Sequence, residues 1–500
     1  MLFDRKEGVK GRRFILLLTL YLLLQVLIRV VVTGNAELDE AEQLVWGQQF
    51  SLGYGAELPL YTWLQALLFS LFGTNIFAVS LLRNLLLFVI YLFTYLNARE
   101  ITGSERCALA AAASLFLIPL ISWESQRILV TMVLATALTA VSLFLFLRML
   151  RTGLLRYYLL FGLAAGFGML TKYNFAIFLV ALLLSALSLR TFHNRLADWK
   201  VLATVAGFFL VTAAPFSWIL SHSGAAMAKT GKLHRGGDAG LLQGYFAGLG
   251  TLTKAVAAFH AFLIPVYLLN FARSPRSEDL SGQDRDRRKL VGRTVLLAIF
   301  ICIVMVLFFR VTFFKARWLL PLLYPVPIYL VAVVQERLGH RPFRRLLVCS
   351  GVVAGVIMLA LPGRIVLARY AGSYSRMNYP YDQLAGQLRS AGFRGGIIVA
   401  ENHQLGGNLK LRFPESRVVV AGFGPLPAAN DQQLLIVWDA VRSGGVPRSL
   451  SPVVASLPAS ANGYIRQAEA PANYVPQRTE RLAYIISEPA PQAPGSRMDR

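Results

Sequence analysis

Long apolar runs alternate with short polar connections from residue 14 to residue 363. Most of the runs hold about 20 residues, the helical length that crosses a hydrocarbon core of roughly 30 Å. We therefore expect an α-helical polytopic membrane protein with about eleven transmembrane helices. Their predicted positions are 14–33, 77–97, 107–122, 128–147, 157–171, 173–190, 200–220, 254–271, 294–312, 318–335 and 345–363.

The basic residues indicate how these helices are oriented. Lys and Arg outnumber Asp and Glu by 50 to 26, which in a soluble protein would favour nucleic acid as a partner, but here they lie mainly between apolar runs. Cytoplasmic connections of membrane proteins are enriched in Lys and Arg. With the N-terminus in the cytoplasm, the basic connections all fall on that side. The opposite, extracytoplasmic side then holds residues 34–76, 123–127, 171–172, 221–253, 313–317 and everything after 362.

Two regions outside the predicted spans carry structure of their own. Residues 34–76 mix aromatic and polar side chains, a pattern typical of helices at the membrane interface. After residue 363 the chain becomes polar, with short apolar strands predicted at 397–400, 418–421 and 434–437 and a helix at 381–391. We expect a transmembrane catalytic domain at 1–363 with its first extracytoplasmic loop at 34–76, a small extracytoplasmic α/β domain at 364–488 and a disordered tail at 489–500.

Composition agrees with a membrane protein and argues against several kinds of chemistry. Hydrophobic residues make up 56% of the chain, against about 45–50% in soluble domains. The three cysteines lie inside apolar runs, so no disulfide framework is expected. The six histidines have no spacing suited to zinc, and no glycine-rich nucleotide motif follows a strand. We expect no required cofactor and no metal site. The alternative is that His222 and His234, which share one outer loop, bind a divalent ion.

Four carboxylates lie just beyond the first predicted span, at Glu37, Asp39, Glu40 and Glu42. A carboxylate at the water boundary can act as a general base that accepts the proton of an attacking hydroxyl. The same residues also fit the N-terminus of a short helix, where acidic side chains offset the helix dipole. The pattern alone supports both interpretations equally.

These acidic residues open an ordered series of motifs. Asp39-Glu40-Ala41 is followed by Leu52-Gly53-Tyr54-Gly55, Pro59-Leu60-Tyr61-Thr62-Trp63-Leu64 and Leu71-Phe72-Gly73, and later by residues 162–173 and Arg317-Trp318-Leu319-Leu320-Pro321. In this order the chain resembles the family-39 glycosyltransferases of the GT-C fold, which include protein O-mannosyltransferases and bacterial lipid A aminoarabinose transferases. The combination of motifs is more specific than any one of them.

The resemblance implies a reaction and a place for it. It implies a multi-pass enzyme of the bacterial inner membrane, with the active site facing the periplasm or exterior. The donor would be a polyprenyl-phosphate sugar, and the transfer would invert the anomeric carbon. The acceptor would be a hydroxyl of the cell envelope, on lipopolysaccharide, another glycan or a protein. Neither the sugar nor the acceptor follows from the motifs.

By motif, the resemblance assigns the catalytic base to Asp39, with Glu40 as its neighbour. Many members of the family have a further acidic residue near the outer start of the fourth span, where residues 128–132 of this chain contain none. Glu124 is therefore the secondary acidic candidate. The first loop also has its own sequence, and the expected acceptor or loop contacts are Glu57 and Tyr61.

Basic residues on the outer face, where Lys and Arg are disfavoured, are expected to bind the donor phosphate. Lys172 has the strongest case, because it belongs to the Thr171-Lys172-Tyr173 motif at a break between two spans. Binding of lipid headgroups is the alternative for these side chains. The other candidates are Arg127, Lys229, Lys232, Arg235, Lys315 and Arg317.

A polytopic transporter or lipid flippase is the alternative function. Its functional charges should lie near the bilayer midplane on broken helices, often within related halves of the chain. Here the candidate residues lie at one face, and no internal repeat is visible. A structural membrane scaffold would leave the ordered motifs without an explanation. The glycosyltransferase hypothesis is therefore preferred.

Overall fold

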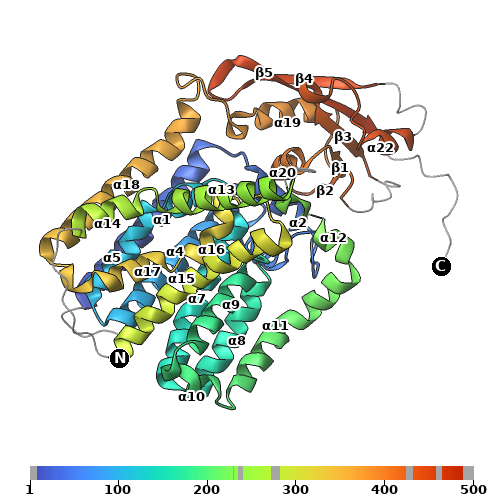
Figure 1. The fold of residues 1–500 in the computed structure, drawn as a ribbon. Coiled ribbons are helices and arrows are strands. Elements are labelled where there is room, and N and C mark those ends of the chain that lie inside the picture. The colour runs from blue at the N-terminus through green and yellow to red at the C-terminus, as the bar shows by residue number, and fades with distance from the viewer. Residues whose placement is uncertain are drawn as a thin grey trace, which may run out of the picture. The chain divides into compact units, whose positions relative to one another are not determined.

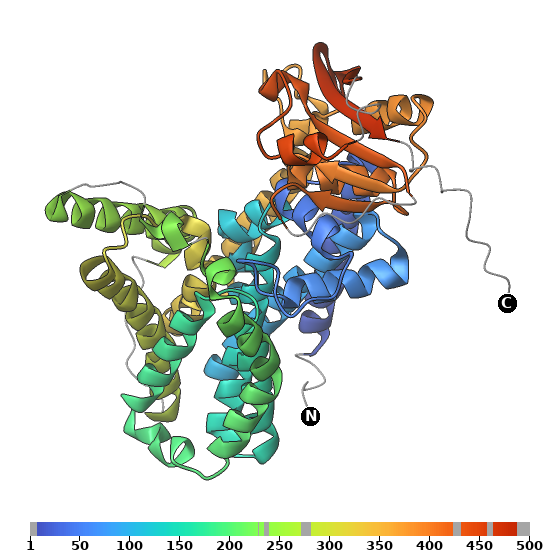
Figure 2. The same ribbon diagram turned by 90° about the vertical axis from the view of Figure 1, so that its right-hand side faces the viewer.

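The computed structural model describes residues 8–228, 230–234, 240–271, 282–423, 432–457 and 464–487. Contacts between segments divide the chain into two compact units. The first unit contains residues 1–26, 51–64 and 81–360, and the second contains 27–50, 65–80 and 361–500. The segment that follows the first span thus folds with the C-terminal part of the chain. Figures 1 and 2 show the elements in two views.

The apolar runs form helices of membrane-spanning length. Six helices of the described residues are long and apolar enough to cross a membrane. They are α1 (Gly8–Val32), α4 (Ile76–Thr102), α7 (Val130–Thr152), α11 (Val201–Ser221), α15 (Gly282–Phe309) and α18 (His340–Val366).

Counting each pair of helices with a sharp bend between them as one crossing adds four further candidate spans. With η marking a 3-10 helix, they are α5–η1 (Glu105–Ser114, Leu115–Leu117) with α6–η2 (Pro119–Ser122, Glu124–Gln126), α9 (Phe175–Leu187) with η3–α10 (Arg190–Phe192, His193–Leu196), α13 (Leu241–His260) with α14 (Leu263–Phe271), and η5–α16 (Ala316–Leu319, Leu320–Leu323) with α17 (Val326–Val333). Together with the shorter apolar helix α8 (Leu155–Met169), these elements occupy all eleven predicted positions.

Prolines account for two of the bends. Pro119 is the first residue of α6, after a bend of 78°, and Pro265 lies in the first turn of α14, after a bend of 58°. A proline has no N–H with which to continue the preceding helix. The span predicted at 254–271 therefore consists of two helices, and the first of them begins earlier than expected, at Leu241.

Small residues allow α8 and α11 of the first unit to approach closely. A Cβ atom on Gly162 would collide with the backbone carbonyl of Thr204, and one on Gly166 would lie 2.9 Å from the carbonyl oxygen of Phe208. Two glycines four residues apart let two helix backbones approach without a hydrophobic driving force, which is absent between helices in lipid. Figure 1 shows α7, α8 and α11 side by side.

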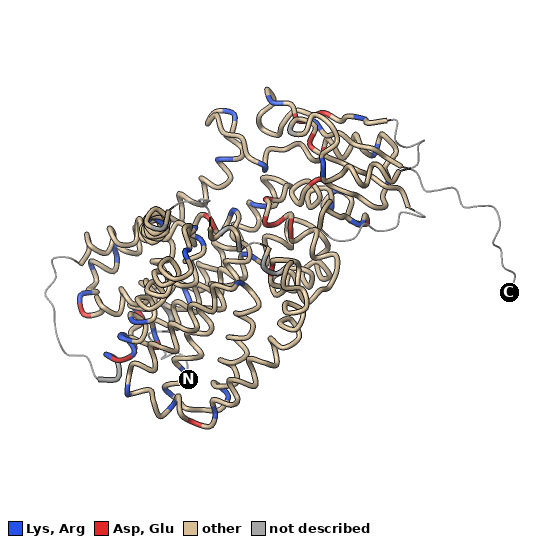
Figure 3. The backbone as a smooth tube through the Cα atoms, turned by 45° about the vertical axis from the view of Figure 1, so that its right-hand side comes forward, with Lys and Arg blue, Asp and Glu red and all other residues tan. Residues whose placement is uncertain are grey.

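The polar helix ends of the first unit form two separate sets of contacts. Among the connections predicted to be cytoplasmic, Glu100 pairs with Arg148 at 3.3 Å and with Arg151 at 2.9 Å. Next to the predicted outer connections 171–172 and 313–317, the Asn174 amide donates to the Trp318 carbonyl at 2.6 Å. Figure 3 shows few charged residues along the middle of these helices.

The C-terminal part of the second unit is built on a five-stranded sheet with the strand order β2-β1-β3-β5-β4. The first three strands are parallel, and β5 pairs antiparallel with both β3 and β4. The strands are β1 (Ile397–Ala400), β2 (Arg417–Val420), β3 (Leu434–Asp439), β4 (Arg466–Ala472) and β5 (Val475–Ser487). The three predicted strands are therefore confirmed, and the last two are additions.

Helices cover both faces of this sheet. On one face, α19 (Tyr381–Ser390) and α20 (His403–Arg412) bury Leu384, Leu388 and Leu409 against the strands. On the other face, Leu450 and Val453 at α22 (Ser451–Ala455) pack against Trp438 of β3. The small α/β domain expected from the sequence is thus present. Short elements complete it, at η7 (Arg376–Asn378) and α21 (Ala440–Ser443).

The segment predicted to hold interfacial helices contains α2 (Leu38–Trp46) and α3 (Leu60–Phe72). Between them, Gly55 adopts a φ of 63° in a turn closed by backbone hydrogen bonds between Tyr54 and Glu57. A left-handed residue favours glycine, because it has no Cβ atom to clash. The remaining short helices of the described residues are α12 (Ser223–Met227), η4 (Thr230–Leu233) and η6 (Gln335–Arg337).

Candidate functional site

The acidic motif forms the first turn of α2, in the second unit. Glu37 is the N-cap residue, and its N–H donates to the Glu40 carboxylate at 2.8 Å. This is one half of a capping box, in which a side chain in the first turn satisfies a backbone donor that the helix leaves open. Part of the acidic cluster therefore lies at the N-terminus of a short helix, which the sequence offered as the alternative interpretation.

Burial separates the two residues predicted to form the catalytic pair. The Glu40 side chain is 0% exposed and pairs with Arg29 of α1 at 2.9 Å, whereas Asp39 is half-buried. The Glu40 carboxylate thus has a guanidinium partner and no exposed surface for an incoming hydroxyl. Asp39 is therefore the more exposed carboxylate of this pair.

Arg29 is a residue that the sequence reasoning missed. It lies near the end of an otherwise apolar span, and besides Glu40 its guanidinium contacts the Thr33 carbonyl at 2.8 Å. Glu37 has a cation of its own, because Arg364 lies 3.3 Å from its carboxylate. The sequence contained a signal for Arg29, because an ionisable residue within an apolar span usually has a partner.

In the first unit, the structure joins two residues that were predicted to have different roles. Lys172, in the turn between α8 and α9, forms an ion pair with Glu57 of the first loop. The loop and the turn are also tied through their backbones, since the Leu60 N–H donates to the Leu170 carbonyl at 3.3 Å.

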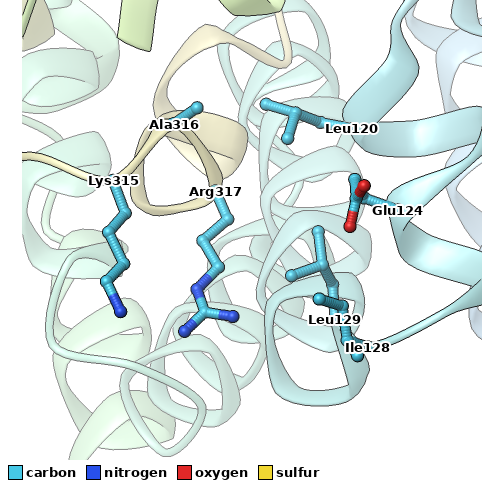
Figure 4. Close-up of a pocket in the computed structure, with 7 residues that line it drawn as sticks. All are labelled: Leu120, Glu124, Ile128, Leu129, Lys315, Ala316 and Arg317. Carbon is cyan, nitrogen blue, oxygen red and sulfur yellow. The ribbon is translucent and has the colours of Figure 1, made fainter. Parts of the chain in front are cut away.

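A pocket of about 320 Å³ in the first unit brings together other predicted residues. Lys315 and Arg317, from the segment that leads into α16, face Glu124 of η2 across it (Figure 4). Glu124 also pairs with Arg127 at 3.0 Å. In the part of the chain that the structure describes, Arg317 has no ion-pair partner. The pocket is completed by apolar side chains, from Leu120, Ile128 and Leu129.

The other predicted site residues lie apart from these two clusters or beyond what the structure describes. Tyr61 is buried in the first turn of α3. Lys229 and Arg235 lie outside the described residues, and Lys232 lies in η4 with its side chain undescribed. Within the described ranges, no group of three or more His, Cys, Asp or Glu side chains is arranged to hold a metal ion. His222 instead stacks on Trp218, with 4.5 Å between the ring centroids.

Known proteins resemble this chain over most of its length. Residues 56–219 match the family model described as dolichyl-phosphate-mannose-protein mannosyltransferase. The lipopolysaccharide core galacturonosyltransferase RgtB of Rhizobium johnstonii is 32% identical over 435 residues, which are 86% of this chain and 87% of RgtB. The lipopolysaccharide core galacturonosyltransferase RgtA of the same organism is 30% identical over 447 residues, which are 87% of this chain and 88% of RgtA.

Solved structures show the same fold. ArnT from Cupriavidus metallidurans in the apo state superposes with a TM-score of 0.61 at 14% identity, over 97% of this chain and all (100%) of ArnT. Its complex with undecaprenyl phosphate gives a TM-score of 0.59 at 13% identity, over 96% of this chain and 99% of ArnT.

The fold is therefore that of a multi-pass GT-C membrane protein, as the motifs implied. The chain belongs to the GT-C glycosyltransferase family that includes the lipopolysaccharide core galacturonosyltransferases. It is a membrane glycosyltransferase.

Proposed function

We propose that this protein transfers galacturonic acid from a polyprenyl phosphate to a hydroxyl of the lipopolysaccharide core, at the extracytoplasmic face of the bacterial inner membrane. The observation that carries the sugar and the acceptor is the similarity to two core galacturonosyltransferases over 86% and 87% of this chain. A structure of the same fold with undecaprenyl phosphate supports the class of lipid carrier.

In the proposed reaction, Asp39 is the general base. Its carboxylate takes the proton from the acceptor hydroxyl while the hydroxyl oxygen attacks the anomeric carbon. The bond between that carbon and the phosphate oxygen breaks on the opposite side, and its electron pair leaves with the polyprenyl phosphate. Attack from the opposite side inverts the anomeric carbon. The half-buried position of Asp39, beside the buried and paired Glu40, supports this assignment.

The charge that develops on the leaving phosphate needs cations. Arg317 is the strongest structural candidate, because it is half-buried in a pocket and has no ion-pair partner among the described residues. Lys315 lines the same pocket, and Lys172 adds an ammonium group, which is paired with Glu57. Charge-assisted hydrogen bonds of this kind are among the strongest available to a phosphate. Because the leaving group is already a phosphate, the reaction as proposed requires no cofactor.

Transfer by the purified protein tests this function. The protein in lipid vesicles is supplied with lipopolysaccharide core and with polyprenyl-phosphate galacturonate, and the mass of the product is measured by mass spectrometry. The control donors carry aminoarabinose or mannose on the same lipid. Each reaction is run with and without EDTA. We expect addition of galacturonic acid alone, unchanged by EDTA. Transfer of another sugar would contradict the proposed donor, and movement of the lipid without a glycosidic product would favour the flippase alternative.

The proposed location makes a topological prediction. Reporters fused after residues 45, 240 and 400 should be extracytoplasmic, and one fused near residue 280 should be cytoplasmic, because the basic connections lie on the cytoplasmic side. Paired alkaline phosphatase and fluorescent protein fusions measure this, since the two are active on opposite sides. A cytoplasmic reporter at residue 45 would place Asp39 on the wrong face for the reaction.

A further inference from the structure

The short segment between α1 and α2 is held by the C-terminal domain, within the second unit. The side-chain amide of Asn408, in α20, forms two hydrogen bonds with one backbone residue. Its Oδ1 accepts from the Ala36 N–H at 2.8 Å, and its Nδ2 donates to the Ala36 carbonyl at 3.0 Å. Both residues are fully buried. Gln404, one turn earlier in α20, donates to the same carbonyl at 2.7 Å.

The two residues before Ala36 have partners in the same domain. Arg412, at the end of α20, donates to the Gly34 carbonyl at 3.0 Å and to the Asn35 side chain at 2.7 Å. Asp382 of α19 holds the Arg412 guanidinium in place, at 3.0 Å. The Asn35 amide in turn donates to the Met377 carbonyl at 2.9 Å. Residues 34–36 therefore have little freedom to move with respect to α20.

α20 also packs directly on α2. A Cβ atom on Gly407 would collide with the backbone of Ala41, and one on Gly406 would press on the strands, with Val418 at 3.1 Å. The two glycines thus let α20 lie closely between the sheet and α2. Ala36, Ala41 and Leu44 complete this contact in one buried apolar cluster, with Leu411 against it.

We infer that α20 positions the catalytic helix, and that Asn408 is the positioning residue through which it fixes the start of α2. This inference rests on the proposed role of Asp39 as the base. Asp39 lies three residues after Ala36 in the first turn of α2, so the bonds that fix Ala36 also fix the direction in which the carboxylate points. A displacement of about 1 Å in a reacting group can lower a rate by about 10²-fold.

Asn408→Leu tests the inference, because leucine has nearly the size of asparagine and forms neither hydrogen bond. We expect the turnover number to fall by about 10–100-fold while the KM for the donor lipid stays unchanged. The matched control is Gln387→Leu. The Gln387 amide makes the same pair of bonds, to the Glu469 backbone at 2.7 and 3.1 Å, and touches no residue of the acidic segment. We expect the control to transfer at the parental rate.

A double variant separates positioning from general damage. If Asn408 acts through Asp39, then adding Asn408→Leu to Asp39→Asn should cause no further loss, since the base is already absent. Multiplied losses would overturn the inference, and so would a parental rate in the single variant Asn408→Leu. Full activity of Asp39→Asn alone would instead remove the proposed base, which distinguishes the two failures.

A second variant keeps the test decisive if Asn408→Leu does not fold. Gln404→Met removes one bond to the Ala36 carbonyl and keeps a side chain of similar length. Its turnover number should fall below that of the parent protein, again without a change in the donor KM and without further loss in the Asp39→Asn background. A changed KM with an unchanged turnover number would mean that α20 contacts the substrate, and would contradict a positioning role.

Discussion

Asp39→Asn protein is expected to fold and insert normally yet to transfer sugar about 10²–10⁴ times more slowly than the parent, the usual contribution of a general base. The amide keeps the size and shape of the carboxylate but cannot take a proton from the acceptor hydroxyl. The measurement is the initial rate of transfer at saturating donor and acceptor. Binding of the donor lipid to the variant, measured separately, excludes a folding defect.

Glu40→Gln is the comparison for Asp39→Asn, because the two residues differ in burial. Its transfer rate per folded molecule should fall far less. Its stability should fall more, since the variant leaves Arg29 without its buried carboxylate partner, a loss of about 3–5 kcal/mol for a buried pair. A thermal unfolding curve measures that loss. If Asp39→Asn transfers at the parental rate and Glu40→Gln does not, the base is Glu40, and if neither loses activity, Glu124 becomes the leading candidate.

Lys172→Ala is expected to have the next largest effect, a loss of about 10–100-fold in kcat/KM for the donor, because a hydrogen bond to a charged group contributes about 1.5–3 kcal/mol. The ammonium group is proposed to bind the donor phosphate. Lys172→Arg should keep part of the activity, because it keeps the positive charge. The rest should be lost, because a planar guanidinium replaces the ammonium group. Steady-state kinetics at varied donor concentration measure all three proteins.

The ion pair with Glu57 gives Lys172→Ala a second explanation, which a double variant resolves. If Lys172 only neutralises Glu57, then Glu57→Gln should restore activity to the Lys172→Ala protein. If Lys172 binds phosphate, the loss should persist in the double variant. Unchanged turnover and donor affinity in Lys172→Ala itself would remove the residue from the site.

The sequence predicted the parallel strands, whose apolar residues are large, and missed both antiparallel strands, including β5 with its large buried side chains Leu482, Tyr484 and Ile485. The parallel strands β1, β2 and β3 are continuous runs of Ile, Val and Leu, and all three were found. β4 was missed because the residues it turns inward are alanines, Ala468, Ala470 and Ala472, which give little hydrophobic signal. A similar limit applies to bends in the membrane helices, where the apolar run continues without interruption although α13 ends at His260 and α14 begins at Leu263.

The sequence predicted which residues could form the candidate site, but it did not predict which residues they contact. The motif placed Asp39 and Glu40 together, but their burial depends on Arg29, in the preceding helix, and on α20, far along the chain. Lys172 and Glu57 each stood out by themselves, and their pairing depends on a contact across 115 residues. Periodicity and spacing describe neighbours along the chain, whereas these contacts are set by tertiary packing.

The hydrogen bonds between Ala36 and Asn408 join residues that are 372 positions apart. A chain emerging from the ribosome therefore makes the acidic segment and all of its membrane spans before it makes the helix that holds that segment. Until α20 has been synthesised and folded, Ala36 lacks these partners and the start of α2 is not fixed. The order of the elements thus delays the fixing of the proposed base until α20, at His403–Arg412, has been made, so we expect no transfer by a chain that stops before this helix.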